Sequence, residues 1–292
     1  DRSSAASDVY KRQDRSVNKG AELNPAVNLL PLLGCGKEPG AFRKLIAEAA
    51  GVREEHLLST ELFLYPRTKA VQTGLNGEFI VSPRLDDLQC VFGCLEGFLA
   101  AKPGGSLPVL AVFNNEEVGS STRQGADSTF LTDVLERIAH GCGLDSEGWK
   151  AAVANSFMVS ADNAHAIHPA HPEYADKGEC PVLGGGIVIK YNANQRYTTD
   201  AVSGAVFQTI CQEAGVPVQR YSNRADLPGG STLGNISTAH LSVPTVDIGL
   251  PQLAMHSVCE TAGAADTDYL VKAMTAYFSR DFHRDRDGGI VF

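Results

Sequence analysis

Two adjacent carboxylates, Glu116 and Glu117, follow an apolar run in the stretch SLPVLAVFNNEEVGS at residues 106–120. The run itself, residues 107–113, is rich in valine and leucine, which is typical of a strand buried on both faces. Successive side chains of a strand point to opposite sides, so one glutamate could bind a metal ion while its neighbour handles a proton. An isolated pair of glutamates is more often a solvated surface loop, so the prediction depends on further ligands.

Three further side chains of the right type lie beside strand-like runs. Asp86 in PRLDDL lies between an extended segment and a helix start, where aspartate is also a common N-cap. Asp162 follows the apolar run 157–160, and His256 comes after the apolar run 244–248. With the two glutamates they form a set of oxygen and nitrogen donors that suits two neighbouring divalent ions such as Zn²⁺, Co²⁺ or Mn²⁺.

Alternating strand and helix patterns from residue 82 onward predict an α/β domain. Apolar residues recur at helical spacing directly after Asp86, and again in the stretches 130–140, 201–214 and 266–282. Strand-like runs cover 107–113, 157–160, 186–191 and 244–248. This alternation predicts a mostly parallel sheet flanked by helices, in which functional sites gather at the carboxyl ends of the strands.

Residues 20–80 follow a different pattern. A helical stretch over 41–50 ends at Gly51, and the strand-like stretches 60–68 and 70–81 are joined by short turns. Consecutive strands with short connections predict a small antiparallel lobe. The first 13 residues are small and polar and begin with a DRS triplet that recurs at residue 14, so we interpret residues 1–13 as a leader that is not part of the fold.

Composition excludes several classes of protein. Of the 292 residues, 43% are hydrophobic and 20% are charged, which describes an ordinary soluble globular protein. The net charge of −9 disfavours nucleic acid as a partner, and no apolar run reaches the roughly 18–20 residues that span a bilayer. Seven scattered cysteines without a CxxC pair indicate neither a disulfide framework nor a thiolate zinc site. We therefore expect a cytoplasmic protein without a membrane segment.

Six segments, in this order along the chain, resemble the aspartyl aminopeptidase family of dinuclear zinc metallopeptidases. They are RLDD, NNEEVGS, SADNAHAIHP, GGIVIKYNANQRY, RADLPGGSTLGNI and QLAMHS, and the resemblance extends from about residue 14 to about residue 282. It implies a catalytic α/β domain over residues 81–292 and a smaller β-rich dimerisation lobe, of which residues 14–80 would be the remnant. It also implies an aminopeptidase that removes N-terminal Asp or Glu from peptides, and a homo-oligomer, commonly a tetrahedral dodecamer.

The resemblance also assigns roles to individual residues. Asp86 would bridge two zinc ions, Glu117 and Asp162 would bind one each, and His256 would complete the ligand set. Glu116 would be the general base that takes a proton from the metal-bridging water. The substrate-binding candidates are Lys190 at the end of IVIKY, which would recognise the acidic side chain, and His165, Gly229, Gly230, Ser231 and Thr232. A lysine at a strand end is by itself more often a surface residue.

One metal ligand of the family has no counterpart in this sequence. The family supplies it from a His-x-Asp motif ahead of the dimerisation lobe, and a further histidine reaches across the dimer interface. The first half of the chain lacks the motif, and His283-Arg284-Asp285 lies in a charged tail after the last predicted helix. We interpret the sequence as N-terminally truncated. The alternatives are an aminopeptidase selective for neutral residues and a catalytically inactive scaffold or binding protein of the same fold.

Overall fold

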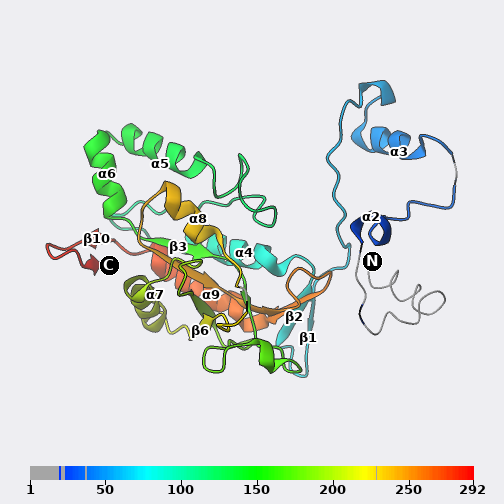
Figure 1. Ribbon diagram of the computed structural model, residues 1–292. Helices are drawn as coiled ribbons and strands as arrows, with labels where there is room; N and C mark the ends of the chain where they lie inside the picture. Colours follow the sequence, from blue (N-terminus) through cyan, green and yellow to red (C-terminus); the bar gives the residue numbers. More distant parts are fainter. Residues whose placement is uncertain (1–19, 21–23, 37, 228) are drawn as a thin grey trace. The chain divides into compact units, whose positions relative to one another are not determined.

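The computed structural model describes residues 20, 24–36, 38–227 and 229–292 (Figure 1). The chain divides into two compact units, Asp1–Arg67 and Thr68–Phe292. The predicted leader, residues 1–13, lies outside the described residues. The predicted division between residues 80 and 81 rests on the family resemblance, and the assignment of residues 14–80 to a dimerisation lobe stays a prediction.

The described part of the first unit is mainly helical. It contains α2 (Pro25–Asn28), α3 (Ala41–Ala50) and the 3₁₀ turn η2 (Glu54–His56). The predicted helix over 41–50 is confirmed, and it ends at Gly51, whose φ of 66° favours glycine. The predicted strand over 60–68 is wrong, because that stretch pairs with no strand among the described residues and leaves Phe63 and Leu64 exposed. An apolar stretch becomes a strand only where a neighbouring strand accepts its hydrogen bonds.

The core of the second unit is a four-stranded sheet with the order β3-β7-β5-β6. Its strands are β3 (Met158–Ala161), β5 (Ile187–Tyr191), β6 (Val218–Ser222) and β7 (Thr245–Gly249). The pairs β3–β7 and β5–β6 are parallel, and β7 joins β5 antiparallel. The two central strands are buried along nearly their whole length, and β5 begins with the run Ile187–Ile189 that is typical of a strand buried on both faces.

Helices flank this sheet, which confirms the predicted α/β class (Figure 1). The core joins α4 (Leu85–Ala100), α7 (Ala201–Glu213) and α9 (Ala264–Phe278) to the central strands through buried side chains such as Cys90, Phe207 and Leu270. Helices α4 and α9 approach closely at Gly97, where an added Cβ would lie 2.5 Å from the Cβ of Met274. The remaining helices are α5 (Phe130–Gly141), α6 (Ser146–Ala154), α8 (Leu233–His240) and the 3₁₀ turn η3 (Pro172–Tyr174).

A second sheet, with the order β1-β2-β9-β8-β4, brings distant parts of the chain together. It consists of β1 (Val71–Thr73), β2 (Phe79–Ser82), β4 (Ala164–His165), β8 (Pro251–Leu253) and β9 (Glu260–Gly263). In the antiparallel pair β2–β9, Ser82 lies opposite Glu260. The start of α4 and the β8–β9 connection are therefore neighbours. The short strands β10 (His283–Arg284) and β11 (Ile290–Val291) pair near the chain's end.

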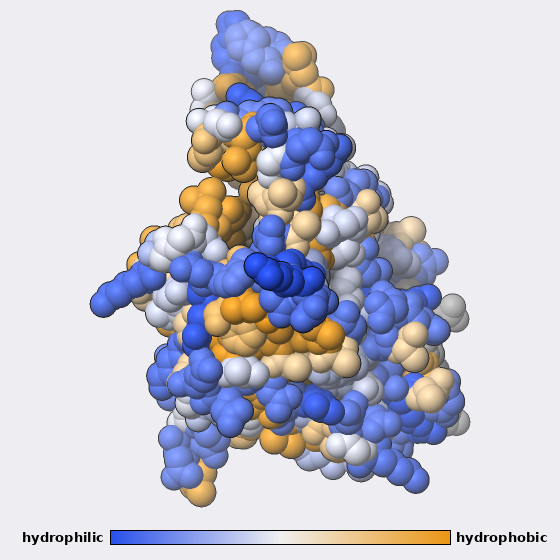
Figure 2. Space-filling model, turned by 90° about the vertical axis from the view of Figure 1, so that its left-hand side faces the viewer, coloured by the Kyte–Doolittle hydropathy of each residue, from blue (hydrophilic) through white to orange (hydrophobic). Residues whose placement is uncertain are grey.

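The predicted central strand over residues 107–113 is not present. This stretch is extended but forms no strand, and Leu107 is 66% exposed. It lines a cavity of about 900 Å³ together with β3, which lies at the edge of its sheet and, among the described residues, pairs with β7 alone. Figure 2 shows apolar side chains gathered at the surface on the side where α5 and α6 lie in Figure 1. The apolar pattern gives the stretch a strand preference, but pairing requires an edge within hydrogen-bonding distance.

No helix among the described residues combines the length and apolar content that crossing a membrane requires.

Candidate metal centre

Asp86 lies where β2 passes into α4, in an irregular first turn. The N-cap of α4 is Arg84, and Asp86 has φ −80° and ψ 115°, which are not helical values. Such values also occur at N-caps, but the Asp86 carboxylate pairs with His256 and accepts no hydrogen bond from a described amide of α4, so its side chain does not cap this helix. Its side chain is only 5% exposed, and its Oδ1 atom is buried without a hydrogen-bond partner in the described part of the chain. A buried carboxylate oxygen without a partner is unusual unless a ligand or ion completes its environment.

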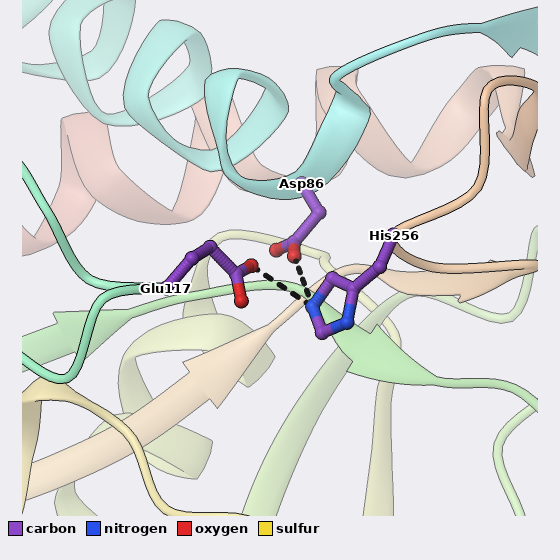
Figure 3. A group of neighbouring side chains, drawn as sticks. All are labelled: Asp86, Glu117 and His256. Carbon is purple, nitrogen blue, oxygen red and sulfur yellow. Dashed lines mark ion pairs between the residues drawn. The ribbon is translucent and has the colours of Figure 1, made fainter. Parts of the chain in front are cut away.

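Three predicted ligands from distant parts of the chain converge on one point (Figure 3). His256 Nε2 lies 3.1 Å from Asp86 Oδ2 and 2.9 Å from Glu117 Oε1. One ligand atom from each of these residues lies within 4.8 Å of the other two. Two carboxylates and an imidazole are ligands that Zn²⁺ and related divalent ions prefer. The buried Oδ1 of Asp86 offers a further oxygen ligand. The residues therefore fit a divalent cation.

A second group of carboxylates adjoins the first. Asp86, Asp87 and Asp162 also place ligand atoms within 4.8 Å of one another. Asp86 belongs to both groups, so it lies between the two possible ion positions, as a bridging ligand would. Asp162 follows β3, as expected, and is held by Lys190, whose Nζ donates to Asp162 Oδ2 at 3.2 Å. Asp87 accepts a hydrogen bond from the backbone of Asn163.

Crowding of negative charge perturbs these carboxylates. Burial and the nearby carboxylates of Asp162 and Glu117 raise the pKa of Asp86 from 3.8 to about 8. Burial and the charge of Asp162 also raise the pKa of Asp87 well above its ordinary value. Like charges held this close are costly without a cation between them. A cation between these carboxylates would relieve their repulsion.

Asp86→Asn is expected to stabilise the metal-free protein more at high pH than at low pH. The folded state raises the pKa of Asp86 from 3.8 to about 8. Its contribution to the free energy of unfolding is therefore fully present below about pH 4, where the carboxyl is protonated in both states. This contribution is lost as the pH rises through about 8. Asparagine stays neutral, so the gain in melting temperature should be small at about pH 5 and increase toward about pH 8. Thermal denaturation with a chelator measures this gain. Asp133→Asn, on exposed α5, is the control, and a gain independent of pH would contradict the prediction.

The two glutamates lie in a turn instead of at a strand end. Gly119 N donates to Glu116 O at 2.8 Å, and Ser120 N donates to Asn115 O at 3.0 Å. The turn separates their roles: Glu117 contacts His256, whereas Glu116 is half-buried and belongs to neither group of ligands. Burial, followed by the charges of Asp162 and Glu117, raises the pKa of Glu116. A carboxylate with a raised pKa beside a metal site suits proton transfer.

Lys190 lies next to the ligands but is not open to solvent. Its ammonium donates to Asn163 O at 2.8 Å as well as to Asp162, and lies 5.5 Å from the centre of the Tyr197 ring. Burial opposes its charge, but Asp162 and then Tyr197 outweigh burial, so the pKa of Lys190 is raised. His165, on β4, is exposed, with its ring 6.5 Å from that of Tyr221.

The predicted glycine loop is anchored at its end. Thr232 is buried, and its hydroxyl lies 3.3 Å from Asp247 Oδ1 and 3.4 Å from Ser160 Oγ. Gly229 O accepts a hydrogen bond from Arg196 Nη1 at 3.1 Å, while Gly230 and Ser231 are exposed. Among the described residues, no hydrogen bond or ion pair joins this loop to the ligand candidates, so its role in substrate binding stays a prediction.

Two residues that organise the site are missed by sequence reasoning. Asn163 joins Asp87, Lys190 and Gln89 through its backbone and side chain. Glu260 accepts backbone hydrogen bonds from both Asp86 and His256. Asn163 lies directly after Asp162 in SADNAHAIHP, so its position gives a weak signal. Glu260 gives none, because nothing local marks it as buried.

Comparison with known proteins shows the family to which the chain belongs. The family model described as aminopeptidase I zinc metalloprotease (M18) matches residues 12–278. A probable M18 family aminopeptidase 2 of Clostridium acetobutylicum is 44% identical over 270 residues, covering 91% of this chain and 62% of the relative. Its counterpart in Mycobacterium leprae is 38% identical over 273 residues, covering 94% and 63%. The chain thus spans less than two thirds of the length of these relatives.

Solved structures show the same architecture. An M18 family aminopeptidase from Thermotoga maritima is similar with a TM-score of 0.76 and 26% identity, covering 89% of this chain and 62% of that one. The mApe1 dodecamer of S. cerevisiae is similar with a TM-score of 0.71 and 28% identity, covering 85% and 59%.

Proposed function

Because this chain belongs to the M18 family of aminopeptidase I zinc metalloproteases, we propose that it acts as a metal-dependent aminopeptidase on peptides with an N-terminal Asp or Glu. The observation that carries the proposal is the convergence of Asp86, Glu117 and His256 on one point beside the half-buried Glu116. The carboxylates also line a cavity of about 900 Å³, which is within the usual size of a ligand pocket.

Asp86, Glu117 and His256 would hold one zinc ion, and Asp162 with the shared Asp86 would hold a second. Bound zinc supplies a Lewis acid that polarises the scissile carbonyl and lowers the pKa of water to about 7. Glu116 accepts the proton that the attacking water loses as its oxygen bonds to the carbonyl carbon. Glu116 then gives this proton to the departing amine as the carbon–nitrogen bond breaks, so the proton taken from water ends on the product amine. Co²⁺ and Mn²⁺ are accepted by the same oxygen and nitrogen donors.

The preference for an acidic residue rests on Lys190. Its charge is retained despite burial, and its ammonium lies beside the ligand candidate Asp162. A buried cation next to the ligands is a chemical reason for selecting a carboxylate over a neutral side chain. We also propose assembly with further copies of the chain, supported by the dodecamer among the similar structures. A cytoplasmic location is supported by seven cysteines that are all free thiols.

Lys190→Leu is expected to remove the preference for acidic peptides. Losing one partner of a buried charge pair costs about 2 kcal/mol or more, so kcat/KM for an Asp-first peptide should fall roughly 30-fold or more. That for a Leu-first peptide should change much less. The measurement compares hydrolysis of Asp-first, Glu-first and Leu-first peptides, with Lys150→Leu on exposed α6 as the control.

Separate results test the activity and the specificity. Co²⁺ binding by Lys190→Leu shows whether loss of the ion pair with Asp162 has disturbed the metal centre. An unsubstituted protein that hydrolyses no peptide with zinc present would overturn the proposed activity. Equal rates on Asp-first and Leu-first peptides would overturn only the acidic preference, in favour of an aminopeptidase selective for neutral residues.

A further inference from the structure

Glu260 is a buried carboxylate at the junction of the two segments that carry Asp86 and His256. It is 2% exposed and opens β9, where it lies opposite Ser82 of β2. Asp86 follows Ser82 by four residues, and His256 precedes Glu260 by four residues in the β8–β9 connection. The side chain of Glu260 is therefore placed between two stretches of backbone that are 170 residues apart in the sequence, 86 and 256.

Each oxygen of the Glu260 carboxylate accepts one hydrogen bond from one of these stretches. Asp86 N donates to Oε2 at 3.1 Å, and His256 N donates to Oε1 at 2.8 Å. Both donors are backbone amides of residues whose side chains meet at 3.1 Å. One carboxylate thus fixes the distance between the two backbones from which both side chains extend.

The backbone at the His256 end of this bridge is unusual, and at the Asp86 end it departs from the helix. His256 has a φ of 66°, in the left-handed region that is unfavourable for a non-glycine residue. Asp86 interrupts the first turn of α4 with non-helical values. Backbone in sparsely populated conformations persists only where surrounding contacts hold it. The hydrogen bond from His256 N to Glu260 is such a contact, and the hydrogen bond from Asp86 N holds the extended residue at the start of α4.

We propose that Glu260 is a positioning residue that holds Asp86 and His256 at the separation a divalent cation requires. The proposal rests on the metal centre of the proposed function. Glu260 touches no reacting atom and acts through the two backbone amides. A partner that orients metal ligands typically contributes a factor of about 10–100 to metal affinity.

The chain offers a matched control in Asp266. This carboxylate on α9 is fully buried and also accepts two backbone hydrogen bonds, from Gly184 N at 2.8 Å and Gly186 N at 2.9 Å. Neither donor is a ligand candidate. Asp266→Asn and Glu260→Gln therefore make the same chemical change at buried carboxylates with the same kind of partners, but only the second alters the support of ligands.

The experiment titrates the full metal-free chain with Co²⁺ and follows its visible ligand-field absorption, together with calorimetry. Glu260→Gln is expected to weaken Co²⁺ binding about 10–100-fold and to alter the absorption spectrum, because the new amide cannot accept both hydrogen bonds. Asp266→Asn should leave the affinity and the spectrum unchanged. Unchanged binding in Glu260→Gln, or an equal loss in Asp266→Asn, would overturn the positioning role. If the unsubstituted chain binds no Co²⁺, the metal centre itself is wrong.

A second measurement on the unsubstituted protein covers the case in which Glu260→Gln does not fold. Amide hydrogen exchange followed by NMR should show the Asp86 and His256 amides protected at least ~100-fold relative to an unstructured peptide. Protection of both amides without metal supports the bridge. Exchange of either amide at the rate of an unstructured peptide would overturn it.

Discussion

Glu116→Gln is expected to lower kcat by about three orders of magnitude while leaving Co²⁺ binding unchanged. General acid–base catalysis contributes about 10²–10⁴-fold to a rate, and glutamine cannot take the proton of the attacking water. Glu116 belongs to neither group of ligand atoms that the described residues form, so its loss should not weaken metal binding. The measurement is single-turnover hydrolysis of an Asp-first peptide, with Co²⁺ titration in parallel.

The neighbouring residue supplies the control. Glu117 lies next in the same turn, but its Oε1 is 2.9 Å from His256 Nε2, so Glu117→Gln should weaken Co²⁺ binding. The two variants make identical chemical changes one residue apart and should have different effects. If Glu116→Gln keeps the full rate, another group is the base. If Glu116→Gln loses Co²⁺ as Glu117→Gln does, Glu116 is a ligand instead.

His256→Ala is expected to weaken Co²⁺ binding by more than about 100-fold, since a direct ligand should matter more than the 10–100-fold effect of a residue that only orients ligands. Its imidazole is the nitrogen donor of the cluster with Asp86 and Glu117, and alanine leaves those two carboxylates without the group between them. Peptide hydrolysis should fall with metal binding and return in part at high metal concentration. Calorimetric titration and zinc content after dialysis measure the effect.

His171 is the matched control for this substitution. Its side chain is 58% exposed, as is that of His256, and its Nδ1 lies 3.0 Å from Glu173 Oε1. His171→Ala therefore removes a histidine of equal exposure that also pairs with a carboxylate but contacts no ligand candidate. Equal Co²⁺ affinity in the two variants would show that the metal is bound elsewhere.

The elements that the sequence predicts well are those whose partners are close in the chain or whose pattern is long. The helices predicted over 41–50, 130–140 and 201–214 are confirmed almost to the residue as α3, α5 and α7. Apolar spacing and end signals such as Gly51 act within the helix itself. The predicted strands at β3, β5 and β7 are also confirmed, although they are short and pair with distant parts of the chain, because each of these apolar runs has another strand edge beside it. The failures at residues 60–68 and 107–113 concern stretches that form strands only if another edge is available.

The sequence by itself determined the donor types of this protein, the order of its motifs and its family, because side-chain chemistry and spacing are written directly in it. Only the tertiary structure decided which donors meet. The β2–β9 pairing brings Asp86 near His256, and a turn instead of a strand directs Glu117 toward both. The role of Glu260 also belongs to the tertiary structure. Its hydrogen bond to Asp86 joins residues 174 positions apart, and no local pattern can encode a contact of that separation.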